Sequence, residues 1–220
     1  MKTETDENYL KEIYELSLDH EHVTTSMLAD RLGHSPPTVT GQLKKLASLK
    51  WVVYAPYQGV TLTDTGRAIA LEVIRHHRLI ETFLAQALGI PWDRVHAEAE
   101  KMEHTLSEYL EERIDELLDH PSVDPHGAPI PSRDGVIPDT HRLRLVDLPV
   151  GTTAQVVEVS DRDPDLLVYL DKLNLRPGME FEVLNVEPID GLITIRAANR
   201  IDTLGQNSAS RIFVKTNVES

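Results

Sequence analysis

The chain has 220 residues, no cysteine and a formal net charge of −14 at pH 7. The missing cysteines exclude disulfides, thiolate metal sites and thiol chemistry, and no apolar run approaches the roughly 18 residues that a membrane span needs. The N-terminal sequence lacks the pattern of a signal peptide. We therefore expect a soluble cytoplasmic protein with no membrane partner, large enough for one large domain or two to three small ones.

The first part of the chain has the element order of a winged helix-turn-helix. Residues 6–18 place apolar side chains near helical spacing, and residues 24–33 predict a short helix that ends at a glycine. After the turn "HSPP", residues 36–51 predict a helix with proline in its first turn, where the missing N–H costs little. Two β-rich runs around Gln58–Gly59 predict a hairpin, the wing of such a motif.

The second helix of this motif enters the DNA major groove, and its N-terminal residues meet base edges. Small hydroxyls and prolines suit thymine methyls and phosphates, and Gln42 suits an adenine. Lys44 and Lys45 suit phosphates, as do the residues at the wing tip. Alternatively, the threonines only cap the helix and the lysines only solvate it. The predicted DNA-binding residues are Ser35, Pro36, Pro37, Thr38, Thr40, Gln42, Lys44, Lys45, Tyr57 and Gln58.

The charge is spread unevenly along the chain. Residues 31–63 carry four bases and no acid, a net charge of +4, whereas residues 81–119 carry eleven acids and three bases, a net charge of −8. A segment with a net charge of +4 favours the binding of a polyanion such as double-stranded DNA, even within an acidic protein. A basic face that is merely solvated is the other interpretation of the charge alone.

Two helices follow the wing. One is predicted from about Thr65 to Leu88 with a broad apolar face, and after the break at "IPWDRV" a second runs to about Asp119. The pair is too apolar for a thin winged-helix domain to cover. We therefore expect a homodimer, which suits a palindromic operator, although packing within one chain would give the same pattern.

The second of these helices carries His96, Glu100, Glu103 and His104 within nine positions. On one helix these side chains fall within roughly a 100° arc, where the carboxylates repel each other unless a cation lies among them. The segment "HHRLIE" (residues 76–81) pairs a histidine and a glutamate in the same way. Oxygen and imidazole ligands without sulfur suit Mn(II) or Fe(II), and Zn(II) stays open because affinity favours it. Surface decoration is the alternative.

Residues 120–142 contain five prolines and two glycines, which predicts a linker or a long ordered loop. Short β-runs and one helical piece, residues 163–175, follow. Several short strands with turn signals predict a small closed β-barrel. The expected fold class is thus mainly α with a β C-terminal part. The expected domains are a winged helix-turn-helix (1–64), a helical metal-binding and dimerisation domain with a Pro-rich linker (65–140) and the barrel (141–220).

The chain resembles the diphtheria toxin repressor family of metal-dependent transcriptional regulators, in its three-domain form. The resemblance spans almost the whole chain and is carried by "YLKEIYEL", "SPPTVTGQLKKLASLKWVVYAPYQGVTLTDTG", "RHHRLIETFL", "VHAEAEKMEH", "DPHGAPIP" and "SDRDPDLLVYLDKLNLRPG". It implies a repressor of metal-uptake genes, not an enzyme, that binds its operator as a homodimer. It also implies two metal positions per subunit.

By position, the resemblance assigns the first metal site to Glu100, Glu103 and His104, with His77 as a further candidate. Iron-responsive members have cysteine in place of Glu100, so the chain is similar to the manganese-responsive branch. Asn8 stands where manganese members typically have aspartate and iron members methionine, and it offers a neutral carbonyl oxygen. The expected metal is Mn(II), with Fe(II) as the alternative.

The resemblance is less definite about the second metal position, because family members differ there. An ordinary turn is the alternative role for the two loop residues. Lys11 replaces a carboxylate of some two-domain manganese members, which argues against their paired-ion arrangement here. The implied ligands are Glu81 with His96, or with Asp124 and His126 of the loop, and Asp161 or Asp163 from the C-terminal domain.

Two other functions fit parts of the sequence. A winged-helix regulator could sense a small organic ligand, in which case metal would not change its DNA affinity. A non-haem metalloenzyme could use paired Glu/His helices, but no nucleophile or base is left once the ligands are assigned. Our hypothesis is that metal joins the first helix to the later helices and so favours one spacing of the two recognition helices.

Overall fold

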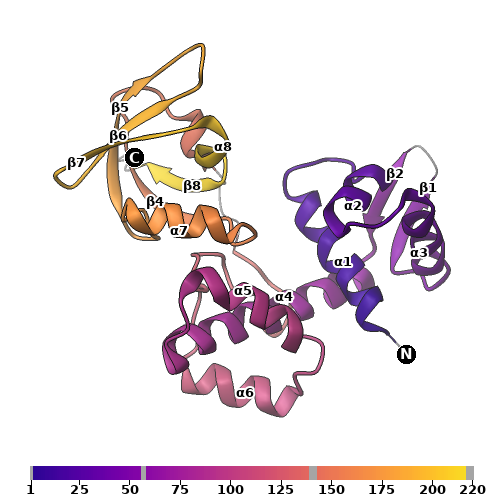
Figure 1. The fold of residues 1–220 in the computed structure, drawn as a ribbon. Helices are drawn as coiled ribbons and strands as arrows, with labels where there is room; N and C mark the ends of the chain where they lie inside the picture. The colour runs from indigo at the N-terminus through magenta and orange to yellow at the C-terminus, as the bar shows by residue number, and fades with distance from the viewer. Residues whose placement is uncertain (1, 56–57, 139–142, 217–220) are drawn as a thin grey trace. The chain divides into compact units, whose positions relative to one another are not determined.

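The computed structural model describes residues 2–55, 58–138 and 143–216 (Figure 1). These residues form two compact units. No helix among them combines the length and the apolarity that crossing a membrane requires. The first unit comprises Met1–His77, Glu103–Leu106 and Pro131–Val136, and the second comprises Arg78–Met102, Ser107–Ile130 and Ile137–Ser220.

The first unit contains the predicted winged helix-turn-helix, which is confirmed. Its elements are α1 (Glu4–Ser17), α2 (Thr25–Leu32), α3 (Pro36–Ser48) and the antiparallel hairpin of β1 (Val52–Ala55) and β2 (Gly59–Leu62). A side-chain oxygen caps the start of each helix, from Thr3, Thr24 and Ser35 in turn, and so satisfies an otherwise free amide of the first turn. Gly33 ends α2 in the left-handed conformation, which glycine adopts without steric cost.

The long fourth helix, α4 (Asp64–Leu88), is also confirmed, but the helix predicted to follow it is wrong in extent. It splits into α5 (Trp92–Met102) and α6 (Glu108–Leu117). Ser107 accepts a hydrogen bond from the backbone of Leu110 as the N-cap of α6, and acidic side chains follow in the first turn. A capping serine followed by acids favours the start of a new helix.

The split relocates two of the four residues that were predicted to share one helical arc. His96 and Glu100 lie on α5, whereas Glu103 and His104 lie in the turn after it. The prediction that all four share one helical arc is therefore wrong. The turn instead lets Glu103 and His104 contact residues that a straight helix would not bring to them.

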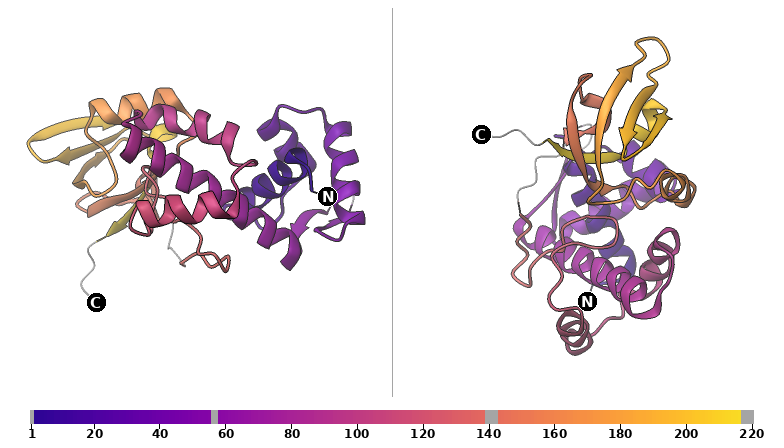
Figure 2. Two further views of the ribbon diagram at one scale, coloured as in Figure 1. Left: turned by 90° about the horizontal axis from the view of Figure 1, so that it is seen from below. Right: turned by 90° about the vertical axis from the view of Figure 1, so that its left-hand side faces the viewer.

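The C-terminal part of the second unit is an antiparallel sheet with the strand order β3-β8-β4-β5-β6-β7. The helix α7 (Pro164–Lys172) lies beside this sheet (Figure 2), and the short α8 (Gln206–Ala209) follows the last hairpin. The leucines of α7 belong to the same hydrophobic core as the inward-facing residues of the strands. The strands are β3 (Leu143–Arg144), β4 (Thr153–Val159), β5 (Glu180–Val186), β6 (Ile193–Ala197), β7 (Arg200–Leu204) and β8 (Ile212–Thr216).

The predicted closed barrel is wrong, because the sheet is open. Closure would require the two edge strands, β3 and β7, to pair with each other, and no such pair exists among the described residues. The chain enters a 3₁₀ turn at Leu145–Asp147 directly after the two residues of β3. An edge strand this short offers too few backbone groups to close a barrel.

The proline-rich segment is an ordered loop over its described residues, 120–138. Val123 and Pro129 form an isolated antiparallel bridge across it, and the side chains between them are largely buried. Of the two predicted alternatives, a linker or an ordered loop, the structure contains the loop.

Candidate metal centres and nucleic-acid interface

Glu103 is the centre of a group of polar side chains in the first unit, which we name the first polar cluster: Glu7, Lys11, His77, Glu103 and His104. The Glu103 side chain is fully buried, and its two oxygens accept hydrogen bonds from Lys11 Nζ at 2.8 and 2.9 Å. Its Oε2 also contacts Nδ1 of His77. Burial raises the pKa of Glu103, but the bonds from His77 and Lys11 outweigh burial and hold that pKa below its usual value. An ionised carboxylate is what a metal ligand requires.

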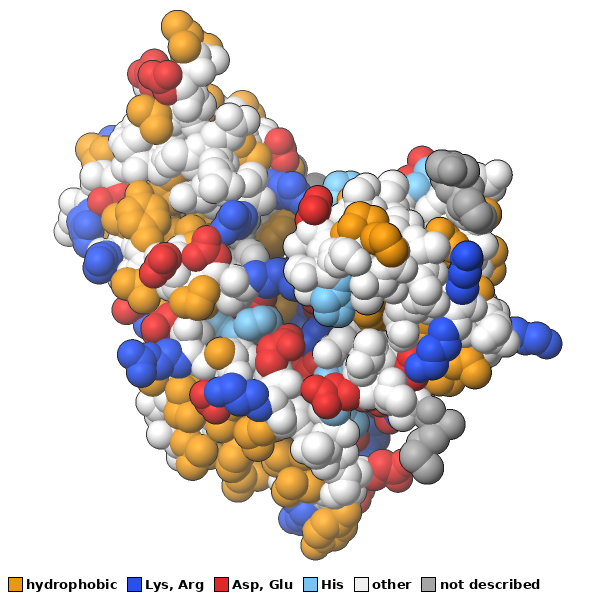
Figure 3. Space-filling view, turned by 45° about the vertical axis from the view of Figure 1, so that its right-hand side comes forward, with side chains coloured by type: hydrophobic (Ala, Val, Ile, Leu, Met, Phe, Trp, Pro, Cys, Tyr) orange, Lys and Arg blue, Asp and Glu red, His pale blue; other side chains and the backbone are white. Residues whose placement is uncertain are grey.

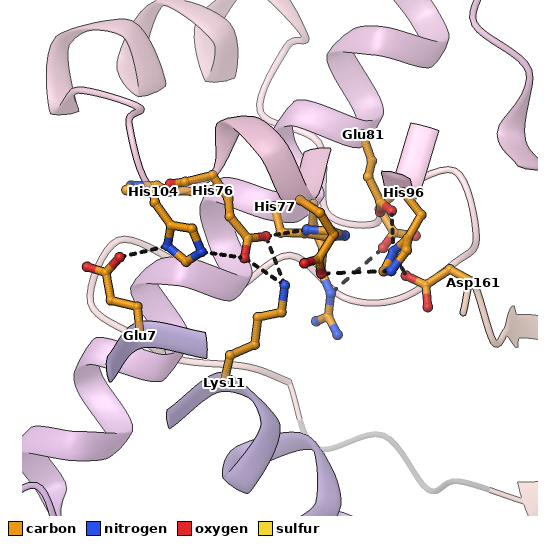
Figure 4. A network of polar contacts seen from close by, with 12 residues as sticks. Glu7, Lys11, His76, His77, Glu81, His96, His104 and Asp161 are labelled. Carbon is orange, nitrogen blue, oxygen red and sulfur yellow. Dashed lines mark hydrogen bonds and ion pairs between the residues drawn. The ribbon is translucent and has the colours of Figure 1, made fainter. Parts of the chain in front are cut away.

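Glu7 orients His104 (Figure 4). Nδ1 of His104 lies 2.7 Å from Oε2 of Glu7. Because an ionised carboxylate only accepts, this ring nitrogen carries the proton and donates it. Nε2 of the same ring is buried, lies 3.4 Å from Oε1 of Glu103 and has no hydrogen-bond partner among the described residues. Carboxylates commonly fix the tautomer of metal-binding histidines in this way. The sequence offered no local signal for Glu7, since 97 positions separate it from His104.

Three atoms in the first unit each keep a lone pair that can be donated to a divalent cation. A carboxylate has about four lone-pair positions, and Lys11 and His77 use three of those on Glu103. Oε1 of Glu103 keeps one, Nε2 of His104 keeps its lone pair, and Oδ1 of Asn8 is buried without a hydrogen-bond partner in the described part of the chain. Oxygen and imidazole donors of this kind suit Mn(II) or Fe(II).

His76 fixes the turn that carries these donors. Its Nδ1 lies 3.1 Å from the backbone carbonyl oxygen of Glu103, which accepts the hydrogen bond. His76 is buried on α4, directly before His77. The histidine that supports the backbone and the histidine that contacts the carboxylate are therefore neighbours, and the sequence predicted a role only for His77.

A second polar cluster lies in the second unit and consists of Glu81, His96, Asp124, His126 and Asp161. Nδ1 of His96 lies 3.3 Å from Oε1 of Glu81 and 3.2 Å from Oδ2 of Asp161 (Figure 4). Nδ1 of His126 lies 3.6 Å from Oε2 of Glu81. The cluster thus joins α4, α5, the loop of residues 120–138 and the segment before α7.

The loop presents His126 in a fixed orientation. Oδ1 of Asp124 accepts from the backbone N–H groups of His126 and Ala128, at 2.8 and 3.0 Å. Nε2 of His126 donates to the carbonyl oxygen of Trp92 at 2.7 Å. A Cβ on Gly127 would lie 1.9 Å from the carbonyl oxygen of Val157, so only glycine fits against β4. Asp124 thus has two roles: its Oδ1 stabilises an ordinary turn, and the residue also belongs to the second polar cluster.

Electrostatics in the second polar cluster favour a bound cation. Burial lowers the pKa of His96, but Asp161 and Glu81 outweigh burial and raise it to about 10. Glu81 likewise outweighs burial at His126, whose pKa rises to about 9. Burial and the neighbouring Glu81 raise the pKa of Asp124 to about 7. Two buried atoms, Nδ1 of His126 and Oδ2 of Asp124, have no hydrogen-bond partner among the described residues, as expected of atoms that would ligate a metal.

One of the predicted ligands, Asp163, lies outside the second polar cluster. Asp163 caps α7 by accepting from the backbone of Leu166, and its Oδ2 lies 2.6 Å from Arg211, so Asp161 is the aspartate that joins the cluster. Glu100 is half-buried on α5 with Oε1 3.8 Å from Nε2 of His96. Its place in the first metal site stays a prediction.

The start of α3 is available to DNA. Ser35 through Thr38 are exposed, Thr40 is half-buried and Lys44 is exposed. Gln42 and Lys45, by contrast, are engaged by Asp6 of α1. At the wing, Gln58 is exposed, and Tyr57 lies outside the described residues.

The second unit exposes apolar side chains along α6. Tyr109 is 74% exposed, Leu117 65% and Leu110 48%, and Met102 at the end of α5 is 39% exposed. Apolar side chains gather along the lower edge of Figure 3, where Figure 1 draws α6. Contiguous exposed apolar surface of this kind marks an interaction site, as the predicted self-association requires.

Three family models together match most of the chain. The model described as "Iron dependent repressor, N-terminal DNA binding domain" matches residues 1–60. "Iron dependent repressor, metal binding and dimerisation domain" matches residues 63–132, and "FeoA domain" matches residues 143–216.

Individual relatives are similar over nearly the full length. The chain is 33% identical over 224 aligned positions to the iron-dependent repressor IdeR of Mycobacterium tuberculosis, covering 96% of this chain and 97% of that one. It is 31% identical to the diphtheria toxin repressor of Corynebacterium diphtheriae, over 87% and 88% of the two chains. A solved structure described as a manganese-dependent transcriptional repressor in complex with manganese is 38% identical, with a TM-score of 0.92 over 96% of this chain and 99% of that one. A structure of ScaR with bound Zn²⁺ is 34% identical, with a TM-score of 0.84 over 96% and 98%.

Proposed function

Because the chain belongs to the iron-dependent repressor family of metal-dependent transcriptional regulators, we propose that it is a Mn(II)-responsive repressor of metal-uptake genes that acts in the cytoplasm and binds a palindromic operator as a homodimer. The family is one of repressors and not of enzymes. Fe(II) is the second candidate metal, since several relatives are iron-dependent repressors. We also propose that the chain divides into three domains: residues 1–64, 65–140 and 141–220.

The observation that carries the choice of metal is the donor set of the first polar cluster. Glu103, His104 and Asn8 offer two oxygens and one imidazole nitrogen, without sulfur. Such a set gives soft metals little advantage and suits Mn(II) and Fe(II). Glu100 and His77 are further proposed ligands of this site.

The second metal position is proposed to use Glu81, His96, His126 and Asp161, with Asp124 beside them. These groups are held in place by contacts within the protein, such as the bond from His126 to the Trp92 carbonyl. A bound divalent cation would supply positive charge among carboxylates that otherwise repel. Burial raises the pKa of Asp161, but the hydrogen bond and charge of His96, with the charge of His126, outweigh burial and hold that pKa below its usual value. The bond from His126 to Trp92 fixes the orientation of one imidazole ring.

Metal binding is proposed to act on DNA binding through α1. This helix supplies Glu7, Asn8 and Lys11 to the first polar cluster, and it packs in the same unit as the recognition helix α3. A cation that binds one position of α1 better than another shifts the protein toward that position, commonly by about 1–3 kcal/mol. Proposed DNA contacts are Ser35, Pro36, Pro37, Thr38, Thr40, Lys44 and Gln58.

Capture of sheared genomic DNA by the purified chain tests this function. One sample contains Mn(II) and the other a chelator, and recovered fragments are sequenced. We expect discrete fragments only with Mn(II), each with a palindromic element. Equal recovery in both samples would support a regulator that senses an organic ligand, and would contradict the metal-dependent function.

A further inference from the structure

The helix α1 has two polar faces with different partners. Glu7 and Lys11, at i and i+4, belong to the first polar cluster and contact His104 and Glu103. Asp6 and Tyr9, at i and i+3, face the helix-turn-helix instead. The hydroxyl of Tyr9 lies 2.9 Å from Nδ1 of His34, the residue before the N-cap of α3, and the two rings stack at 5.8 Å.

Asp6 makes the most extensive of these contacts. The residue is fully buried. Its Oδ1 accepts hydrogen bonds from Nε2 of Gln42 and Nζ of Lys45, both at 2.6 Å. Its Oδ2 accepts from the backbone N–H of Thr3 at 3.1 Å and completes the capping box of α1. One carboxylate thus ties the start of α1 to the middle of α3.

The two lysines of α3 therefore differ in their surroundings although they are adjacent. Lys45 is paired with a buried carboxylate, and such pairing opposes the approach of a phosphate to the same ammonium group. Lys44 lies about 100° further round the helix, is exposed, and has no hydrogen bond or ion pair with another described residue. Its charge is available to a polyanion.

We propose that Asp6 is a positioning residue for DNA recognition: it holds Gln42 and Lys45 against α1 and leaves Lys44 as the lysine of α3 that contacts phosphate. This inference rests on the proposed function. It reassigns two residues that the sequence predicted as DNA contacts. Asp6 also lies on α1, two residues before Asn8, which is a proposed metal ligand.

The first test needs no DNA, so its result is independent of the proposed function. The full chain is treated with a limiting amine-acetylating reagent, and the rates at Lys44 and Lys45 are measured by mass spectrometry. We expect Lys44 to react several-fold faster in the wild type. In Asp6→Asn, which keeps a hydrogen-bonding oxygen but loses the charge, Lys45 should approach the rate of Lys44. Equal rates in the wild-type protein would overturn the proposal.

The second test measures the salt dependence of binding to a captured DNA fragment. Log K falls as log salt concentration rises, and each phosphate contact makes this slope steeper by about 0.9. A homodimer carries two copies of Lys44, so Lys44→Ala should make the slope shallower by about 1.8. Lys45→Ala should change the slope by much less. Asp6→Asn should make the slope steeper, and adding Lys45→Ala should reverse that change. Equal losses in the two single lysine variants would contradict the proposal. If no DNA is captured, the function fails while the acetylation rates still decide the role of Asp6.

Discussion

Replacing Glu103 with alanine is expected to abolish Mn(II)-dependent DNA binding and to destabilise the protein at the same time. The lost carboxylate is a proposed ligand of the first metal site. Loss of a supporting partner of a ligand alone costs about 10–100-fold in metal affinity, so loss of the ligand itself should cost more. Titration with Mn(II), followed by the electron paramagnetic resonance signal of the free ion, measures this change.

The destabilisation follows from Lys11. This lysine is 3% exposed, and Glu103 accepts hydrogen bonds from its ammonium group through both oxygens. Removing one partner of a buried ion pair costs about 3–5 kcal/mol. The free energy of unfolding by urea, with chelator present, should fall by that amount.

Two variants separate the two effects. The double variant Lys11→Met/Glu103→Gln removes both charges, so it should recover much of the stability while metal binding stays weak. The exposed pair Glu98–Lys101 provides the matched control, because Glu98→Ala removes a surface ion pair worth about 0–1 kcal/mol. Wild-type metal affinity in the double variant would show that Glu103 is not a ligand.

Replacing Glu81 with alanine should remove one Mn(II) equivalent and alter how stability depends on pH. Glu81 is fully buried and contacts both histidines of the second polar cluster. Without it, His126 loses the partner that raises its pKa to about 9. Metal binding at the first polar cluster should persist, since none of its donors changes. Undiminished Mn(II) stoichiometry in Glu81→Ala would contradict the second site.

The raised pKa values of the two histidines determine the direction in which stability changes with pH. A histidine whose pKa is raised by folding adds stability that is fully present below its unfolded value of 6.5 and is lost as pH rises through the folded value. The folded values are about 10 for His96 and about 9 for His126. The metal-free wild type should therefore lose stability between about pH 6.5 and 10, and Glu81→Ala should lose less. Urea unfolding at a series of pH values measures both.

Local patterns in the sequence were enough to predict the helix-turn-helix and the long α4. Capping hydroxyls, a proline in the first turn of α3 and the glycine after α2 act over a few residues, and each is visible in a short stretch of sequence. The break between α5 and α6 was missed because histidines and glutamates at helical spacing continue across it. Ser107 was the available signal, as a capping residue at the start of α6.

The metal clusters could be predicted by residue type but not by arrangement. Spacing and family resemblance indicated Glu103, His104 and Glu81 as ligands. Neither gave the hydrogen bond from Lys11 to Glu103 or the one that Glu7 accepts from His104, because pairs 92 and 97 positions apart depend on how the chain folds. The open sheet escaped prediction for a similar reason. Short alternating strands are common to barrels and open sheets, and pairing between the edge strands decides which one forms.

The most direct test of metal-dependent repression is the affinity for Mn(II) measured with and without a captured DNA fragment. Coupling between two binding sites is reciprocal, so DNA must tighten metal binding by the same factor by which metal tightens DNA binding. We expect a factor of about 5–150, with equal values from the two directions. The same Mn(II) affinity with and without the fragment would contradict the proposal that metal bound by this chain controls its binding to DNA.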